Sequence, residues 1–234
     1  MRRLTVSLDA FCALREASGT EEPDLAAAAA LAELAGADGI RLGLGEELRP
    51  VRESDARELR RVGRELELRI APSQALLKLA LEVRPDRVLL AGEGREHGAG
   101  PLNPRSLATA AGPVLRALRE SGIAAAVLVA PDLEAVKAAH AAGAPAVELH
   151  TGLLVDLPAI ERAPLLERLS DACRLASKLR LEPTLGGGLG FRSLPAILAA
   201  APSAERVALG RALAARAALV GVDRAVRDLR ALVG

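Results

Sequence analysis

Short apolar runs alternate with helical patterns along the whole chain. Near-continuous apolar runs are typical of parallel strands that are covered on both faces. Eight strands are predicted in this way, at residues 4–8, 39–44, 66–71, 86–91, 123–129 and 146–149, and two more within residues 181–216 that end at Gly186-Gly187-Gly188 and at Gly210-Arg211. The regular alternation indicates that the strands form one parallel sheet with helices between them.

The segments between these runs carry helix signals. Asp24 and Ser73 are residues that favour a helix N-terminus, Gly36 favours a helix C-terminus, and Pro131-Asp132 favours a further start. A short amphipathic piece also follows the first strand. The helices expected between strands are residues 24–36, 53–66, 73–84, 105–120 and 133–144, one that ends near residue 178, and a last one at 211–233.

This alternation predicts the α/β class and a single (β/α)8 TIM barrel, with an extra short N-terminal helical segment and one domain over residues 1–234. The alternative, an open doubly wound sheet for dinucleotides, needs a GxGxxG turn after the first strand. The chain has Ser7-Leu8-Asp9-Ala10 there, so the barrel is the better prediction.

Composition and charge exclude several function classes. Of the 234 residues 50% are hydrophobic, yet there are only 2 Phe and no Trp or Tyr, so the core must be aliphatic. A net charge of +1, from 31 Lys and Arg against 30 Asp and Glu, argues against nucleic acid or a membrane surface as partner. Without an apolar leader or spanning run, a cytoplasmic protein is expected.

Polar residues at the carboxyl ends of the predicted strands are the candidates for a site, because barrel enzymes build their sites there. Glycines at the ends of the last two strands are typical of a phosphate site, since they admit a ligand to backbone N–H groups. The candidates are Ser7, Asp9, Gly43, Gly45, Glu46, Arg69, Glu93, Asp132, Glu148, His150, Thr151, Gly186, Gly187, Gly188, Gly210 and Arg211.

Each charged candidate also has an ordinary structural explanation. Asp9 is suited to capping the following helix, and Arg69 and Glu148 are suited to pairing with each other in the barrel mouth. His150 is suited to a hydrogen-bonded structural role. Cys12 and Cys173 are expected to be buried and apolar. No cluster has metal-ligand spacing and no nucleophile pair is evident, so neither a metal nor an acyl-enzyme is predicted.

Short motifs that run through the chain form a more specific pattern. They are Leu14-Arg15, Gly19-Thr20, Pro23-Asp24, Ala37-Asp38-Gly39-Ile40, Leu81-Glu82 with Pro85, Glu93, Gly122-Ile123, VELHTG at residues 147–152, Gly186, Gly188-Leu189 and Leu209-Gly210. In register and over essentially the whole chain, this set resembles the pyridoxine 5′-phosphate synthase family of vitamin B6 biosynthesis.

The resemblance implies a barrel that assembles into a homo-oligomer, an octamer in this family. It implies a transferase-type condensation of 1-deoxy-D-xylulose 5-phosphate with 3-amino-2-oxopropyl phosphate, with release of phosphate and water and without a metal or organic cofactor. Asp9, Glu148 as the charge stabiliser, and the phosphate-site glycines Gly188 and Gly210 match the family pattern.

The departures from the family pattern fall on its chemistry. By the resemblance, the histidine that accepts a proton corresponds to Gly43, the catalytic glutamate to Arg69, and the proton-donating histidine to Gly187. The other changed positions, where the family has Asn, His, Arg, Arg, His and His in turn, are Ser7, Ala10, Ser18, Gly45, Pro50 and Arg211. Since each proton-transfer group contributes about 10²- to 10⁴-fold in rate, ordinary synthase activity is not expected.

Two function classes therefore stay open. One is a non-catalytic homologue that binds a phosphorylated small molecule, as a sensor or as a subunit of a synthase assembly. The other is an enzyme, either a divergent synthase or one with different chemistry that uses Asp9, Glu148 and His150. In both, Ser7, Arg69, Gly188, Gly210 and Arg211 are expected to bind the ligand, and residues 94–100 are a candidate lid.

Overall fold

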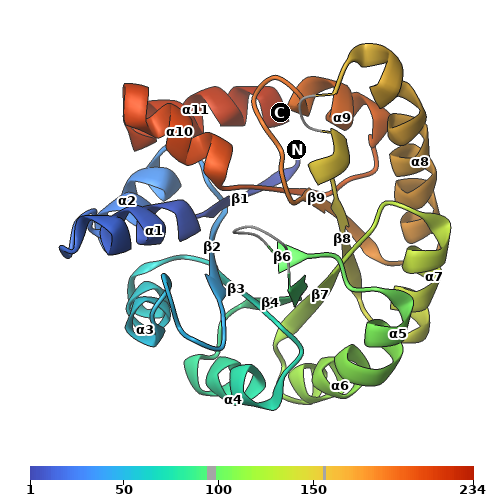
Figure 1. Cartoon of the computed structure of the whole chain (residues 1–234), viewed down its shortest axis with the longest axis horizontal. Helices are drawn as coiled ribbons and strands as arrows, with labels where there is room; N and C mark the ends of the chain where they lie inside the picture. The colour runs from blue at the N-terminus through green and yellow to red at the C-terminus, as the bar shows by residue number, and fades with distance from the viewer. Residues whose placement is uncertain (94–98, 155–156) are drawn as a thin grey trace.

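A closed barrel of eight parallel strands forms the centre of the computed structural model (Figure 1), which describes residues 1–93, 99–154 and 157–234. The strands run in the order β1-β10-β9-β8-β7-β4-β3-β2 around the barrel. They are β1 (Arg3–Ser7), β2 (Gly39–Leu44), β3 (Leu66–Ile70), β4 (Arg87–Leu90), β7 (Ala124–Val129), β8 (Ala146–His150), β9 (Glu182–Gly186) and β10 (Arg206–Leu209). The predicted (β/α)8 TIM barrel is confirmed.

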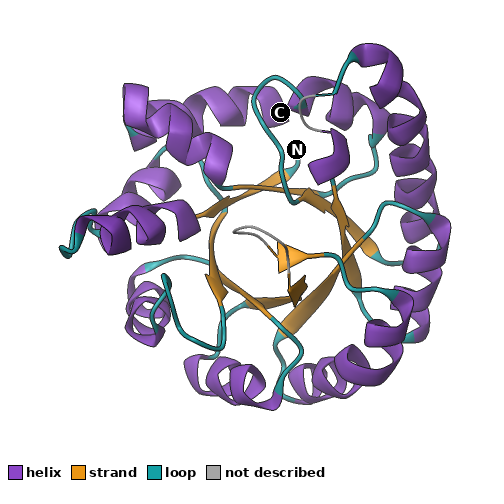
Figure 2. Cartoon of the chain, in the orientation of Figure 1, coloured by secondary structure: helices purple, strands orange, loops and turns teal. Residues whose placement is uncertain are grey.

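A ring of helices covers the outside of the barrel, as the purple helices around the orange strands show (Figure 2). They are α2 (Leu25–Leu34), α3 (Glu53–Val62), α4 (Gln74–Val83), α5 (Pro104–Ser106), a π-helical turn at Leu107–Ala111, α6 (Gly112–Glu120), α7 (Leu133–Ala141), α8 (Ala159–Lys178), α9 (Leu194–Ala200), α10 (Arg211–Val220) and α11 (Val222–Val233). The side chains of Asp24 and Ser73 cap α2 and α4 as predicted.

Two details of the helices differ from the sequence prediction. The expected helix 105–120 is broken into α5, the π-helical turn and α6. The expected last helix 211–233 is two helices, because Gly221 between α10 and α11 has a φ of +81°, which no helical residue adopts. The extra N-terminal helical segment is confirmed as α1 (Asp9–Ser18), which lies between β1 and α2.

The core is aliphatic and has two parts. The larger part lies between the strands and the helices, and it includes the outward-facing residues of every strand. The smaller part lies inside the barrel and consists of Leu89, Ala91, Ala126, Leu128 and Ala146, from β4, β7, β8 and the residue after β4. Polar and charged side chains, among them those of Arg41, Glu67, Arg87 and Glu148, fill the rest of the interior, and the functional candidates on the strands belong to this polar half.

Cys12 and Cys173 are buried and free, as expected. Burial raises the pKa of the Cys12 thiol to about 12, and the charges of Asp55 and Asp9 act in the same direction. Both cysteines therefore act as small apolar residues.

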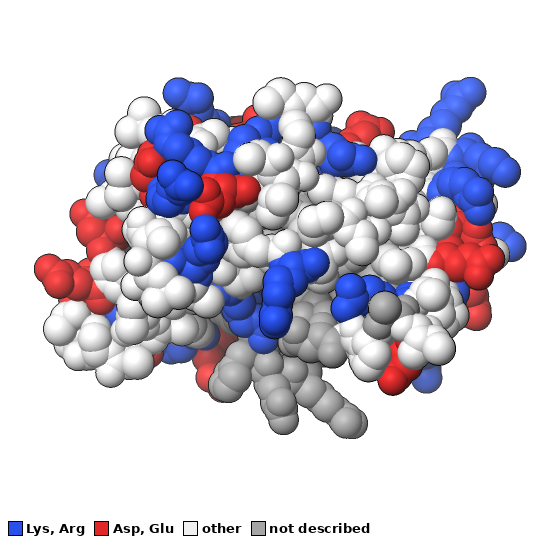
Figure 3. Space-filling model, turned by 90° about the horizontal axis from the view of Figure 1, so that it is seen from above, with Lys and Arg blue, Asp and Glu red and all other residues white. Residues whose placement is uncertain are grey.

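Beyond the carboxyl end of β4, the short strand β5 (Gly92–Glu93) pairs antiparallel with β6 (Ala99–Gly100) (Figure 1). Most of the candidate lid, residues 94–98, lies outside the described residues. Among the described helices, none is long and apolar enough to cross a membrane. Figure 3 shows that basic and acidic side chains are interspersed with uncharged ones on one side of the molecule.

Candidate functional site

Asp9 lies at the mouth of the barrel and is held by two neighbours. One carboxylate oxygen accepts a hydrogen bond of 2.7 Å from the backbone N–H of Gly43, and the other lies 2.9 Å from a guanidinium nitrogen of Arg69. The carboxylate does not cap α1, so the capping alternative is wrong. Asp9 instead joins the ends of β1, β2 and β3.

Arg69 stands directly above Gly43. A Cβ added at Gly43 would lie only 2.4 Å from Nη2 of Arg69 and 2.9 Å from the carboxylate of Asp9. The absence of a side chain at position 43 therefore makes room for the guanidinium group. The pair is about three-quarters buried, with exposed fractions of 24% for Arg69 and 25% for Asp9.

Glu148 lies deeper, on β8, and is only 1% exposed. Its partner is Arg41 of β2, whose Nη1 and Nη2 both donate to the carboxylate, the former at 2.9 Å. The expected ion pair between Arg69 and Glu148 is therefore wrong: each has a different partner. The Glu148 carboxylate fills the space above Gly186, where an added Cβ would lie 2.0 Å from Oε1.

Arg41 is not among the residues predicted from the sequence, although its positive charge faces the buried carboxylates of the site. Its Nε also donates to Glu67 of β3, so one buried guanidinium serves two buried carboxylates. Burial by itself would lower the pKa of Arg41, but the charges of Glu148 and Glu67 outweigh burial and raise it. A signal was present in the sequence, since Arg41 and Gly43 are two residues apart and face the same side of β2.

His150 lies at the end of β8 in a slot between two glycines. A Cβ at Gly187 would lie 2.3 Å from Cδ2 of the ring, and one at Gly152 would lie 2.5 Å from Cε1. Partial burial lowers the pKa of His150, the charge of Glu148 opposes this shift, and Arg211 adds to it. The imidazole is therefore neutral near pH 7.

The glycine turns after β9 and β10 lie beside this ring. Gly187 and Gly188 have φ values of +70° and +106°, which favour glycine. Gly210 precedes α10, whose first N–H groups have no side-chain cap, and it packs against Ser7, since an added Cβ would lie 3.0 Å from that residue's Cβ. Phe191 after the first turn packs on Arg216 of α10, 5.3 Å from ring centroid to guanidinium carbon.

The remaining candidates take other places. Asp132 caps α7 and Thr151 donates to the carbonyl of Gly186, so both have structural contacts. Gly45 and Glu46 are exposed in the turn after β2. The side chain of Glu93 is outside the described residues, as is His97. No group of metal-binding side chains gathers anywhere in the described ranges.

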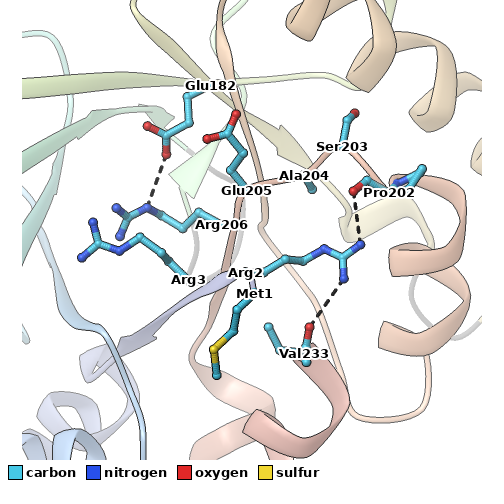
Figure 4. Close-up of a pocket in the computed structure, with 11 residues that line it drawn as sticks. Met1, Arg2, Arg3, Glu182, Pro202, Ser203, Ala204, Glu205, Arg206 and Val233 are labelled. Atoms are coloured by element: carbon cyan, nitrogen blue, oxygen red, sulfur yellow. Dashed lines mark hydrogen bonds and ion pairs between the residues drawn. The ribbon is translucent and has the colours of Figure 1, made fainter.

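A cavity of about 740 Å³ opens at the opposite end of the barrel (Figure 4). It is lined by the amino ends of strands, with Arg3, Glu182 and Arg206 among its residues. Its arginines are already engaged: Arg2 donates to two backbone carbonyls, Arg3 pairs with Glu65, and Arg206 pairs with Glu65 and Glu182. Barrel enzymes place their chemistry at the other end, so this cavity is not the candidate site.

The fold and the mouth together define a TIM barrel with a phosphate-type pair of glycine turns after its last two strands. The family model described as "Pyridoxal phosphate biosynthesis protein PdxJ" matches residues 4–234. Pyridoxine 5′-phosphate synthase from Syntrophotalea carbinolica is 39% identical, and that from a Synechococcus strain is 38% identical, each over 100% of this chain and 99% of the relative. The chain belongs to the pyridoxine 5′-phosphate synthase family.

Solved structures agree on the fold alone. A tryptophan synthase α-subunit from Pyrococcus furiosus superposes with a TM-score of 0.65 over 100% of both chains, at 17% identity. A thiamine phosphate pyrophosphorylase from the same organism superposes with a TM-score of 0.62 at 16% identity, over 99% of this chain and 95% of the other. Both comparisons support the barrel architecture.

Proposed function

We propose that this chain binds a phosphorylated small molecule at the mouth of the barrel and lacks the ordinary synthase reaction of its family. The observation that carries the proposal is the position of Arg69, whose guanidinium fills the space above Gly43 and pairs with Asp9. By the resemblance, position 43 holds the proton-accepting histidine of the family, and position 69 holds its catalytic glutamate.

The carboxylates that remain are poorly placed to replace those groups. Asp9 is bound by the Gly43 N–H and by Arg69, and Glu148 is bound on both oxygens by Arg41. Both carboxylates therefore already accept hydrogen bonds from groups of this chain, which leaves fewer lone pairs for a substrate. Loss of the proton-transfer groups at 43, 69 and 187, each contributing about 10²- to 10⁴-fold, supports the loss of synthase activity.

Binding of a phosphate group is supported by the other side of the mouth. The N–H groups at the start of α10 and after Gly188, with Ser7 close to Gly210, suit an anion. Arg211 at the first position of α10 adds a fixed positive charge, which suits a phosphate better than a neutral imidazole does. Arg69 is proposed to bind a second anionic group once it leaves Asp9.

Calorimetry with a simple phosphate ester tests the phosphate site. A hydrogen bond to a charged group contributes about 1.5–3 kcal/mol, so Arg211→Ala should weaken binding by about 10- to 100-fold. Arg57→Ala, on an exposed pair of α3, is the matched control and should bind as the unchanged protein does. Equal affinities for the Arg211 variant and the control would remove Arg211 from the site.

An assay with both family substrates tests the loss of synthase activity. The purified protein should form no pyridine product from 1-deoxy-D-xylulose 5-phosphate and 3-amino-2-oxopropyl phosphate, followed by absorbance. Product at the rate of a pyridoxine 5′-phosphate synthase measured alongside would overturn this part of the proposal and favour the second candidate.

The second candidate is an active enzyme, either a divergent synthase or one with different chemistry on the same barrel. One observation favours it: the imidazole of His150 occupies the space above Gly187, where the family has a histidine side chain. The imidazole of His150 therefore lies beside position 187, although residue 187 itself is a glycine.

A homo-oligomer is also part of the proposal, and the family resemblance points to an octamer. Large apolar side chains on the surface support self-association, among them Leu14 of α1, Leu34 of α2 and Leu219 of α10, which are 59%, 71% and 83% exposed. Light scattering on the purified protein should give a mass several times that of the 24.2 kDa chain, and a monomer would contradict this.

A further inference from the structure

His150 is unusual for a partly buried histidine, because neither ring nitrogen has a hydrogen-bond partner within residues 1–93, 99–154 and 157–234. A structural histidine in such a place is normally hydrogen-bonded. Packing rather than hydrogen bonding fixes this ring, since Gly152 and Gly187 lie against its two sides. The slot holds the ring while leaving its nitrogens free to contact something else.

The charges around the ring act on its proton affinity in opposite directions. Glu148 stabilises the imidazolium form and Arg211 destabilises it, while burial favours the neutral ring. An anion at Arg211 would cancel the positive charge that acts against protonation. Binding of a phosphate group would therefore make His150 a stronger base at the moment when the ligand is present.

We propose that His150 contacts the phosphorylated ligand and is the proton acceptor of this mouth, held in place by the slot between Gly152 and Gly187. The inference rests on the proposed phosphate site and extends it, because it assigns a proton-accepting group to that site. The ligand class is a phosphate ester with an acidic O–H or C–H bond within reach of the ring.

The chemical step conserves protons and charge. The O–H or C–H bond of the ligand breaks, its electron pair stays on the ligand, and a new N–H bond forms on the ring. The imidazolium that results lies near Glu148, and the negative charge left on the ligand lies in a mouth that also contains Arg69 and Arg211. The same proton returns to the ligand or to water in the reverse transfer.

Nuclear magnetic resonance of the histidine ring carbons tests the proposal, with inorganic phosphate as the probe. The signal of His150 is assigned by its loss in His150→Gln. In the unchanged protein, saturating phosphate should raise the pKa of His150 by about half a unit or more, because it places an anion beside the ring. His140 on the exposed face of α7 should not respond.

Two glycine variants separate the slot from a general effect on folding. Gly152→Ala places a Cβ 2.5 Å from the ring without a positive φ at that residue, so it should displace the ring and abolish the phosphate response. Gly112→Ala, at the start of α6 and outside the mouth, whose added Cβ meets only the Leu107 carbonyl oxygen at 3.9 Å, should keep it. Circular dichroism of both variants checks that the barrel is folded.

The outcomes distinguish this inference from the function on which it rests. Phosphate that binds by calorimetry without moving the pKa of His150 would overturn the role of His150 and leave the phosphate site standing. A response that survives Gly152→Ala would overturn the slot as its cause. Failure of phosphate to bind at all, in calorimetry and in the ring signals, would overturn both.

Discussion

At the scale of single residues, the mouth of the barrel shows side chains occupying space above glycines. Arg69 covers Gly43, Glu148 covers Gly186, and His150 covers Gly187. Each of these side chains belongs to a strand next to the one that carries, or ends at, its glycine. A substitution to or from glycine at the mouth therefore acts on a neighbouring strand as well as on its own.

This coupling predicts the behaviour of a double variant at positions 43 and 69. Gly43→His alone must displace the guanidinium of Arg69, because its Cβ would lie 2.4 Å from Nη2. Combined with Arg69→Glu, the guanidinium no longer has to be displaced, only the Asp9 carboxylate 2.9 Å away has to shift, and the two new side chains can pair. Contacting residues show coupling energies of about 0.5–3 kcal/mol. The loss in the free energy of unfolding of the double variant should therefore be smaller, by that amount, than the sum of the losses of the two single variants.

Urea denaturation of the four proteins of this cycle measures the coupling. The matched control pairs Arg69→Glu with Gly45→Ala, since an added Cβ at Gly45 meets nothing within 4 Å. That pair should be additive. Additive energies in the Gly43 cycle as well would contradict the idea that Arg69 depends on the glycine below it.

The positions of these residues could be predicted from the sequence better than their partners could. The carboxyl-end rule placed Asp9, Arg69, Glu148 and His150 near one another, because strand ends can be read along the chain. It did not find the partners, since pairing across a barrel depends on which side chains reach the same layer of the interior. Arg69 and Glu148 were expected to pair, but they lie at different depths, one at the rim and one 1% exposed.

At the scale of elements, one arginine connects three strands inside the barrel. Arg41 of β2 binds Glu67 of the neighbouring β3 and Glu148 of β8, and all three side chains are at most 4% exposed. β2 and β8 are not neighbours in the sheet, so this contact crosses the barrel interior. The contact with Arg41 fixes the Glu148 carboxylate inside the polar half of the barrel.

Removal of Arg41 should therefore destabilise the whole barrel. Arg41→Met leaves two carboxylates buried with less positive charge beside them, and breaking such a pair from one side costs about 3–5 kcal/mol. Adding Glu148→Gln should recover part of the loss, because one buried negative charge is removed. Denaturation curves give these free energies, and Arg57→Met on the exposed face of α3 should cost less than about 1 kcal/mol. A similar small cost for Arg41→Met would show that the buried pair is not needed.

The elements themselves were predictable where local chemistry decides them. Asp24, Ser73 and Asp132 cap helices as their residue types favour, and the apolar runs became strands within one or two residues. The break at Gly221 was missed because Val220 and Val222 continue the apolar pattern on both sides of it. A glycine in a helical pattern is ambiguous until its φ is known.

At the scale of the whole molecule, ion pairs run from the floor of the barrel to its mouth. They join Arg3, Glu65, Arg206, Glu182, Arg87, Glu67, Arg41 and Glu148 in this order. The series contacts β1, β10, β9, β4, β3, β2 and β8, and thus most of the barrel. The polar half of the interior is therefore neutralised by pairing, while the apolar half is filled by the cluster around Leu89.

This arrangement predicts an acid-dependent stability centred on Glu67. Burial by itself would raise the pKa of Glu67, but the charges of Arg41, Arg87 and Arg206 outweigh burial and lower it. The folded-state pKa thus lies below the unfolded value of about 4.3. The ionised carboxylate therefore stabilises the fold fully above that pH, and the stabilisation is lost as the pH falls through the folded-state pKa.

Chemical denaturation at a series of pH values compares the unchanged protein with Glu67→Gln. At pH 7 the variant should be less stable, because three arginines lose a buried partner charge, and the difference should shrink as the pH falls below about 4. Glu16→Gln, on an exposed pair with Arg49, is the control and should show little difference at any pH. A stability gap that stays constant from pH 7 down to acid would mean that Glu67 is not held in its ionised form by the arginines around it. The series of ion pairs would then not be what stabilises the polar half of the barrel at neutral pH.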